Sequence, residues 1–291
     1  MRQSSRVPSQ KISTLVSAVD GTLVTDDKVL HASARNAVVE LHARGIIFAI
    51  VSSRPTRGLR MLLDPLRLTT PVCGFNGGVI ATPDLSVITE HLLPPDIARR
   101  AVELLDARNI QAWVFVGEDW LLRDPGGAYI GREEHTVGFK PTIVEDFGPH
   151  LDGAAKIVGV SANFALLAQC ERDMRIALAE QASVARSQAY YLDVTHPLAN
   201  KGVALSELVR LLGVPLAEIA VIGDGDNDVA MFEQSGLSIA MGNASAEVQR
   251  AADFVTGSNH ENGFSAAVER FILGNARSNA EAVIVRAGGR V

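Results

Sequence analysis

The chain has 291 residues, of which 47% are hydrophobic and 21% charged, and its formal net charge is −6. This composition is typical of a folded globular protein and excludes disordered, fibrous and disulfide-scaffold classes. The acidic balance provides no basic face for nucleic acid. The longest apolar run, residues 46–51, is far shorter than the roughly 18 residues that a membrane span needs. We therefore expect neither nucleic acid nor a membrane as a partner.

The cysteine content and the first residues bear on the cellular compartment. Cys73 and Cys170 are far apart in the sequence, and we expect two free thiols, as in a reducing cytosol. Residues 1–13 are mostly polar, and we expect a flexible N-terminus. The apolar stretch that follows is soon interrupted by Asp20, which argues against a secretory signal. We expect a cytoplasmic protein.

Short apolar segments alternate with helical patterns in the first part of the chain. Apolar runs at 15–19, 46–51 and 72–75 predict strands, and the spacing of apolar residues at 32–44 and 56–63 predicts helices. Strands that alternate with helices on short connections indicate a parallel α/β sheet. The strands are continuously apolar, as expected when helices cover both faces of a sheet.

The last part of the chain repeats this alternation. The pattern predicts a helix over 201–212, strands at 219–222 and 237–241, and helices at 245–251 and 264–273. Each predicted strand is again short and apolar. Both ends of the chain therefore contribute to one predicted sheet, with a length of chain between them that does not follow the same pattern.

The middle of the chain shows a different pattern of predicted helices and strands. Helices are expected at 95–108 and 163–180. Strand-like pieces occur at 111–116, 119–123, 155–161, 183–186 and 189–193. We predict an α/β fold in which a Rossmann-like parallel sheet core carries an inserted α+β domain. The predicted boundaries are 14–82 and 195–275 for the core, 83–194 for the insertion and 276–291 for a tail.

The strongest chemical signal is the Gly-Asp-Gly-Asp-Asn-Asp sequence at 223–228, directly after a predicted buried strand. In parallel sheets, ligands bind beyond the carboxyl ends of the strands. Asp224, Asp226 and Asp228 repel one another and favour a bound cation. Oxygen ligands favour Mg²⁺ or Ca²⁺, and a few carboxylates with a substrate phosphate are typical of Mg²⁺. The alternative is an acidic turn without a ligand.

The end of the first predicted strand carries an anion-binding signal. Gly21 and Thr22 follow Asp20 and predict a tight turn whose backbone N–H groups suit a phosphate. The alternative is a simple turn.

Two further signals lie at predicted helix starts. Ser52, Ser53 and Arg54 follow the second strand, where a hydroxyl and helix-start amides can bind an anion, although an ordinary helix cap has the same pattern. Lys201 begins a helix, where the helix dipole disfavours a cation. This position favours a role for Lys201 in binding an anion.

Taken together and in this order, these motifs resemble the haloacid dehalogenase-like phosphatase superfamily. That family has an Asp-x-Asp-Gly-Thr loop, a Ser or Thr after the second strand, a Lys, and an acidic Gly-Asp-x-x-x-Asp loop. The resemblance covers residues 14–82 and 195–273. The Asn76-Gly77 turn before an insertion of this size resembles the Cof-type branch, whose members carry a large α+β cap.

The resemblance implies a magnesium-dependent phosphatase of small phosphorylated metabolites, such as sugar phosphates or a nucleotide-like cofactor. It implies that Asp20 transfers protons, that Ser52 and Lys201 bind the phosphoryl group, and that Asp20, Asp224 and Asp228 hold Mg²⁺. It implies further substrate contacts at Gly21, Thr22, Ser53, Arg54, Asn76, Gly77 and Asn227. The oligomeric state is left open.

The chain departs from the family pattern at Ala18, where the family has its nucleophilic aspartate. A methyl group neither attacks phosphorus nor ligates Mg²⁺, and loss of a nucleophile elsewhere costs on the order of a millionfold in rate. We therefore expect the chain as written to be nearly inactive. An engineered change that traps substrate is favoured by retention of every other motif residue. The alternative is a natural pseudophosphatase that binds phosphometabolites without catalysis.

Overall fold

The computed structural model describes residues 11–274, which pack as two compact units. The first unit contains the chain up to Ile50, Leu66–Thr70 and the chain from Leu205 onward. The second contains Val51–Pro65 and Pro71–Ala204. The tail predicted at 276–291 and most of the predicted flexible N-terminus lie outside the described residues. The predicted domain boundaries at 83 and 194 stay a prediction.

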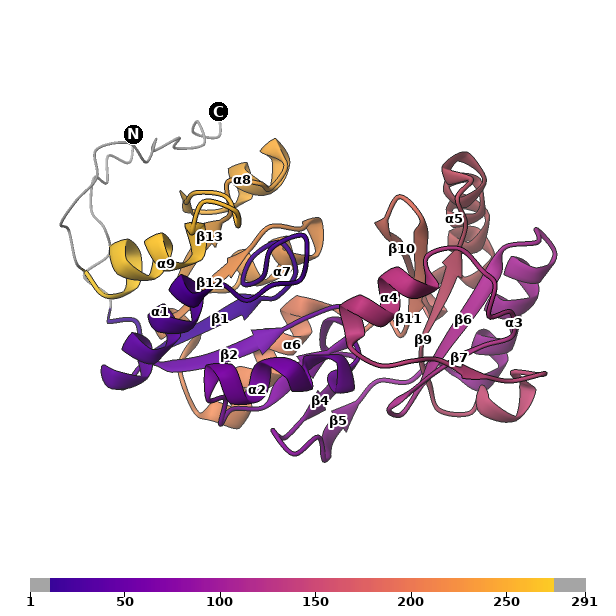
Figure 1. Ribbon diagram of the computed structural model, residues 1–291, viewed down its shortest axis with the longest axis horizontal. Helices are drawn as coiled ribbons and strands as arrows, with labels where there is room; N and C mark the ends of the chain where they lie inside the picture. Colours follow the sequence, from indigo (N-terminus) through magenta and orange to yellow (C-terminus); the bar gives the residue numbers. More distant parts are fainter. Residues whose placement is uncertain (1–10, 275–291) are drawn as a thin grey trace. The chain divides into compact units, whose positions relative to one another are not determined.

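An eight-stranded sheet runs in the order β14-β13-β12-β1-β2-β3-β4-β5 (Figure 1). Its strands are β1 (Thr14–Ala18), β2 (Ile47–Val51), β3 (Val72–Gly74), β4 (Val79–Ala81), β5 (Val87–Glu90), β12 (Ile219–Gly223), β13 (Leu237–Ala240) and β14 (Phe254–Val255). The pairs β1/β12, β12/β13 and β13/β14 are parallel, as predicted, whereas β3/β4 and β4/β5 are antiparallel. The β4–β5 extension has no counterpart in the sequence prediction, because its strands are only three and four residues long.

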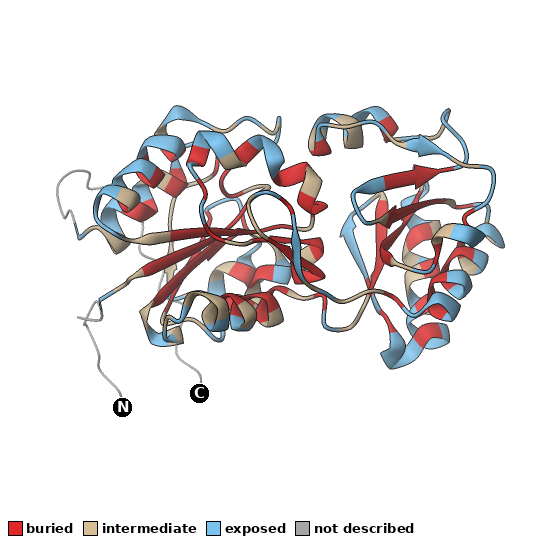
Figure 2. Cartoon of the chain, turned by 90° about the horizontal axis from the view of Figure 1, so that it is seen from below, coloured by how far each residue is buried: buried red, intermediate tan, exposed pale blue. Residues whose placement is uncertain are grey.

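Most helices that accompany this sheet follow the predicted alternation, and the four-residue helix at 229–232 was not predicted. They are α1 (Ala32–Ala43), α2 (Arg60–Leu66), α6 (Lys201–Leu212), α7 (Val229–Phe232), α8 (Ala246–Ala251) and α9 (Gly263–Ala267), which Val268–Ile272 extends as a wider turn. In α1, the buried residues Ala34, Ala37, Val38 and Leu41 recur at helical spacing. Figure 2 shows the central strands buried and the outer helix faces exposed, as expected for a sheet covered by helices. The edge strand β5 is mostly exposed.

A second, six-stranded sheet has the order β10-β11-β9-β6-β7-β8 and lies wholly in the second unit. Its strands are β6 (Gln111–Val116), β7 (Asp119–Leu122), β8 (Thr142–Ile143), β9 (Ala154–Val160), β10 (Ser183–Gln188) and β11 (Tyr191–Thr195). Its helices are α3 (Pro95–Asp106), α4 (Ile130–Val137) and α5 (Phe164–Leu178). All of its strand pairs except β7/β8 are antiparallel, which agrees with the predicted α+β character.

The two faces of the second sheet bury different side chains. One face packs aliphatic residues against α3 and α5, among them Ile157 and Leu192. The other buries an aromatic cluster in which the rings of Trp113 and Trp120 lie 4.9 Å apart and Tyr191 lies 5.3 Å from Trp113. Strand residues alternate between the two faces. Both faces of this sheet are therefore apolar.

The main polar exception in this sheet is a buried ion pair. Lys156 on β9 and Asp193 on β11 lie 2.7 Å apart, and each side chain is only 10% exposed. The strands are antiparallel neighbours, with Thr195 opposite Lys156 and Asp193 opposite Val158. Each charge has lost most of its hydration, so the folded state needs each charge to stabilise the other.

Lys156→Met is expected to destabilise the protein by about 3–5 kcal/mol, because it leaves a buried carboxylate without its counter-charge. Chemical denaturation followed by circular dichroism measures this loss. The double variant Lys156→Met/Asp193→Leu is the control, because it removes both charges and should recover most of the stability. A single variant as stable as the parent would show that the pair is not buried.

Two histidines stack where the chain enters and leaves the segment that contains the second sheet. The rings of His91, after β5, and His196, after β11, are 5.5 Å apart and nearly parallel. The backbone N–H of Leu198 donates to Nδ1 of His196. Burial, with a smaller contribution from the charge of His91, holds the pKa of His196 below its ordinary value.

Since the pKa of His196 is lower in the folded than in the unfolded chain, the unfolded state binds more protons, and stability falls as pH drops through about 6.5. We expect melting temperature to fall less between pH 7.5 and 5.5 in His196→Gln than in the parent. His31→Gln, an exposed position before α1, is the control and should keep the parent's pH dependence. An unchanged pH dependence in His196→Gln would contradict this prediction.

Candidate active site

The acidic part of the site is the region around Asp20, Asp224 and Asp228 in the first unit. Two adjacent parallel strands assemble it. β1 ends at Ala18 and β12 at Gly223, and Ser17 lies opposite Ile222. Asp20 and Asp224 therefore both follow the carboxyl edge of the sheet, where ligands bind in parallel α/β folds. Ala18 is the last residue of β1 and is buried.

Asp224 is fixed against the turn that follows β1. The Thr22 hydroxyl donates to its Oδ1 at 2.7 Å. Gly21 has a φ of +72°, and a Cβ at that position would lie 2.1 Å from Oδ2 of Asp224. The carboxylate thus occupies the space that any side chain at 21 would need. The tight turn that the sequence predicts at Asp20-Gly21 is present, and this contact explains why it needs glycine at 21.

The backbone N–H groups of this turn bear on the anion site that the sequence predicts there. The N–H groups of Thr22, Leu23 and Val24 all donate to the carbonyl of Val19, at 2.9–3.3 Å. Closing the chain after β1 therefore uses the N–H of Thr22, and anion binding at this turn stays a prediction. The hydroxyl of Thr22, which is buried, binds Asp224 instead.

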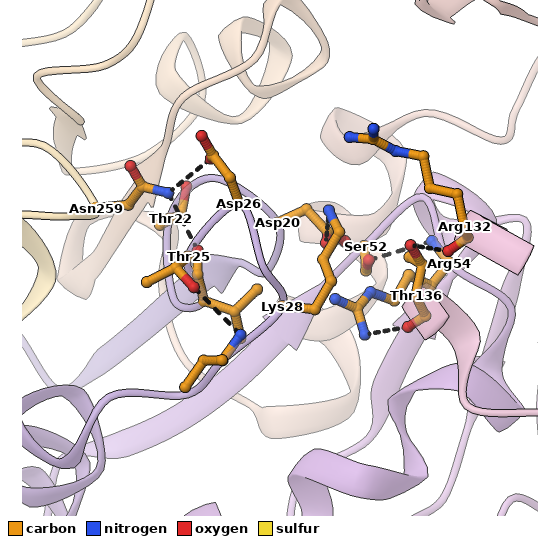
Figure 3. A network of polar contacts seen from close by, with 12 residues as sticks. Asp20, Thr22, Thr25, Asp26, Lys28, Ser52, Arg54, Arg132, Thr136 and Asn259 are labelled. Carbon is orange, nitrogen blue, oxygen red and sulfur yellow. Dashed lines mark hydrogen bonds and ion pairs between the residues drawn. The ribbon is translucent and has the colours of Figure 1, made fainter. Parts of the chain in front are cut away.

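Asp20 and Asp228 each have a partner inside the first unit. Lys28 lies 2.8 Å from Oδ1 of Asp20, with the two side chains 18% and 27% exposed (Figure 3). Asp228 is buried, and its Oδ2 accepts the backbone N–H groups of Asp224 and Gly225 at 2.9 and 2.8 Å. Asp228 therefore closes the acidic loop and orients Asp224. Asp226 and Asn227 lie in the short turn between them.

The second unit brings together several of the remaining predicted residues. Ser52 is buried after β2, and its carbonyl accepts the N–H of Asn76 at 2.7 Å. Gly77 has a φ of +95°, and a Cβ there would lie 2.4 Å from Cβ of Ala204. Ala204 is in the first turn of α6, which begins at Lys201. Ser52, the Asn76-Gly77 turn and the start of α6 are thus neighbours.

Lys201 is 4% exposed. The side chain of Asn200 caps its helix, because its Oδ1 accepts the N–H of Val203 at 3.0 Å. A lysine that is this deeply buried at a helix start has neither full hydration nor a favourable dipole. The binding of an anion by Lys201 stays a prediction.

Arg54 is held in an unexpected way. Its guanidinium donates to the carbonyl of Thr136 at 2.7 Å (Figure 3). It also contacts Sδ of Met61 at 3.8 Å, and the side chain is buried. Thr136 lies in the last turn of α4, where exposed carbonyls attract cations. The N–H of Arg54 donates to the hydroxyl of Ser52 at 3.1 Å, and Ser53 lies between them half-buried. The structure thus places the charge of Arg54 against a helix end.

Sequence reasoning missed two residues of the acidic part. Lys28 is one of five lysines in the chain, and this scarcity was the one signal for it. Asn243 follows β13, and its amide donates to the carbonyl of Gly21 at 2.9 Å. No local spacing pattern in the sequence predicts such a contact, because the two residues are 222 positions apart.

Comparison with known proteins identifies the family. A profile of haloacid dehalogenase-like hydrolases matches residues 15–268. The chain belongs to this family. It is 28% identical over 280 residues to 5-amino-6-(5-phospho-D-ribitylamino)uracil phosphatase YwtE of Bacillus subtilis, covering 88% of this chain and 96% of that protein. The family resemblance and the α/β fold inferred from the sequence are confirmed.

Another curated relative and a solved structure are consistent with this family assignment. An HMP-PP phosphatase of Cronobacter sakazakii is 28% identical over 228 residues, covering 78% of this chain and 82% of that protein. The crystal structure of a haloacid dehalogenase-like hydrolase from Bacteroides thetaiotaomicron matches with a TM-score of 0.81 and 27% identity, covering 89% of this chain and 99% of that one. Within residues 11–274, no helix has both the length and the apolar character to cross a membrane.

Gly21→Ala is expected to destabilise the protein by about 1–3 kcal/mol through backbone strain, and in addition to displace Asp224. Gly45→Ala is the matched control, since Gly45 has a similar φ of +70° but nothing within 4 Å of the added Cβ. Urea denaturation compares the two losses. Equal losses in the two variants would contradict close packing of Asp224 on residue 21.

Proposed function

We propose that this family member is a cytoplasmic, magnesium-dependent phosphatase scaffold for small phosphorylated metabolites, of the sugar-phosphate or nucleotide-like cofactor kind. The observation that carries the proposal is the packing of the Asp224 carboxylate on the Asp20–Gly21 turn at the ends of two parallel strands. The cytoplasmic assignment rests on the two free, buried cysteines, since thiols persist in reducing compartments.

The residues present fit a magnesium site with few protein ligands. The described part of the chain holds no group of three His, Cys, Asp or Glu side chains suited to a metal. The donors at hand are the carboxylate of Asp224, the backbone carbonyl of Asp20 and Asp228. Mg²⁺ characteristically takes one or two carboxylates and completes its shell with waters and substrate phosphate. A bound Mg²⁺ would neutralise negative charge on the phosphoryl oxygens.

The chain's own residues have separate tasks in this proposal. The hydroxyl of Ser52 and the ammonium of Lys201 bind the phosphoryl oxygens and stabilise the charge that develops on them. Asp20 gives a proton to the leaving oxygen and later takes one from the hydrolytic water. Lys28, 2.8 Å from Asp20, holds that carboxylate in place before substrate binds. Gly21, Thr22, Asn76, Gly77 and Asn227 shape the surrounding loops, and Ser53 and Arg54 complete the turn after β2.

The residue at position 18 determines whether this site hydrolyses phosphate esters. A carboxylate there would attack phosphorus and form an aspartyl-phosphate, expelling the alcohol that Asp20 protonates. Ala18 cannot, so we propose that the chain as written binds phosphate esters and hydrolyses them very slowly. The second candidate function, a non-catalytic phosphometabolite-binding protein, is favoured by this one residue. In either case the ligand is a small phosphate ester.

The relatives narrow the ligand class. YwtE is named for a phosphorylated ribitylaminouracil and the Cronobacter protein for HMP-PP. We propose that a phosphorylated metabolite of comparable size is the ligand here. Isothermal titration of the chain with such esters, with and without Mg²⁺, tests binding independently of catalysis.

Ala18→Asp is expected to raise the rate of p-nitrophenyl phosphate hydrolysis in the presence of Mg²⁺ by several orders of magnitude, up to about a millionfold, because it restores the nucleophile. Phosphate release measures the rate. Ala18→Asn is the control, since it supplies similar volume without a nucleophilic carboxylate and should stay inactive. If Ala18→Asp binds Mg²⁺ but shows no turnover, the phosphatase proposal fails and the binding protein is favoured.

A further inference from the structure

Asn243 occupies a fixed position beside the acidic loop. It follows β13, directly after Gly242. The N–H of Gly242 donates to the carbonyl of Gly257 at 2.9 Å, and a Cβ on Gly242 would lie 2.9 Å from backbone atoms of Gly257 and Ser258. Two backbone segments therefore touch at this point. Their contact restrains the backbone that carries the exposed Asn243.

The amide of Asn243 joins three loops. Its Nδ2 donates to the carbonyl of Gly21 at 2.9 Å and lies 3.4 Å from Oδ2 of Asp224. Its Oδ1 accepts the backbone N–H of Asn259 at 3.0 Å. One side chain thus contacts the turn after β1, the carboxylate after β12 and the loop after β14.

Asn259 makes further hydrogen bonds to the loop that follows β1. It is 7% exposed. Its Nδ2 donates to the carbonyl of Val24 at 3.3 Å and to Oδ1 of Asp26 at 3.2 Å (Figure 3). The loop of residues 19–26 is therefore held at Gly21 by Asn243 and, a few residues on, by Asn259. Asn243 is the member of this pair that also reaches Asp224.

The chemistry of the amide suits this position. Thr22 already donates to Oδ1 of Asp224, and Asn243 approaches the other oxygen. An amide is neutral, so it orients a carboxylate without cancelling the charge that a cation needs. A lysine or arginine at 243 would compete with the cation for Asp224. Such supporting hydrogen bonds around a metal ligand typically contribute 10–100-fold in metal affinity.

We propose that Asn243 is a positioning residue that sets the placement of Asp224 relative to the Asp20–Gly21 turn and so determines the affinity for Mg²⁺. The inference rests on the proposed function, because it assumes that Asp224 ligates the metal. In this proposal Asn243 acts on the metal through Asp224 and is not itself a ligand. Its effect is on the geometry of the pair formed by the Asp20 carbonyl and the Asp224 carboxylate.

The test compares Asn243→Ala and Asn243→Leu in the Ala18→Asp chain. Leucine keeps the branched shape of the asparagine side chain and removes all three amide contacts. Isothermal titration with Mg²⁺ alone should show binding about 10–100-fold weaker than in the Ala18→Asp parent, and kcat should recover at saturating Mg²⁺. Asn36→Ala, an exposed asparagine on α1, is the matched control and should bind Mg²⁺ as the parent does.

A second readout needs no metal. Hydrogen exchange of the peptide covering residues 19–26 should be faster in both Asn243 variants and unchanged in Asn36→Ala. Unchanged Mg²⁺ affinity or unchanged exchange in the Asn243 variants would overturn the inference, as would an Ala18→Asp chain that binds no Mg²⁺. Weakened binding together with an Ala18→Asp chain that lacks turnover would support the inference and refute the phosphatase activity.

Discussion

The acidic part of the site depends on one steric constraint: the carboxylate of Asp224 fills the space where a side chain at position 21 would lie. Glycine at 21, with its positive φ, is therefore required both for the turn and for the approach of Asp224. The approach is possible because β1 and β12 are parallel neighbours that end in step. Thr22 and Asn243 then fix the carboxylate that this packing has brought in.

The carboxylates of Asp20, Asp224 and Asp228 each have a protein donor that compensates for the repulsion between them. Asp20 has Lys28, Asp224 has Thr22, and Asp228 has two backbone N–H groups. The loops can therefore adopt this arrangement without help from a cation. With alanine at 18, the cluster carries one negative charge fewer than the family pattern, so its attraction for a cation is weaker and its repulsion of a phosphate ester is smaller.

The sequence predicted most strands, most helices and the parallel sheet, because these follow from local apolar patterns. It missed α4, whose buried residues Ile130 and Val137 flank a mixed-charge run that looks solvated after a Gly/Pro-rich loop. The motif residues could be proposed from the sequence because each lies at a strand or helix end. Lys28 and Asn243 were not, and neither was the contact between Arg54 and Thr136, because these partnerships form between side chains and loops that no local spacing connects.

The aromatic cluster of the second sheet has a practical consequence. Trp113 and Trp120 are the two tryptophans of the chain, and their rings lie 4.9 Å apart in the second unit. Intrinsic tryptophan fluorescence therefore originates from that unit alone, with the two indoles close enough to exchange excitation energy. The unit that carries Asp20 and Asp224 is silent in this signal, so the two units can be followed separately in one experiment by pairing emission with a backbone spectrum.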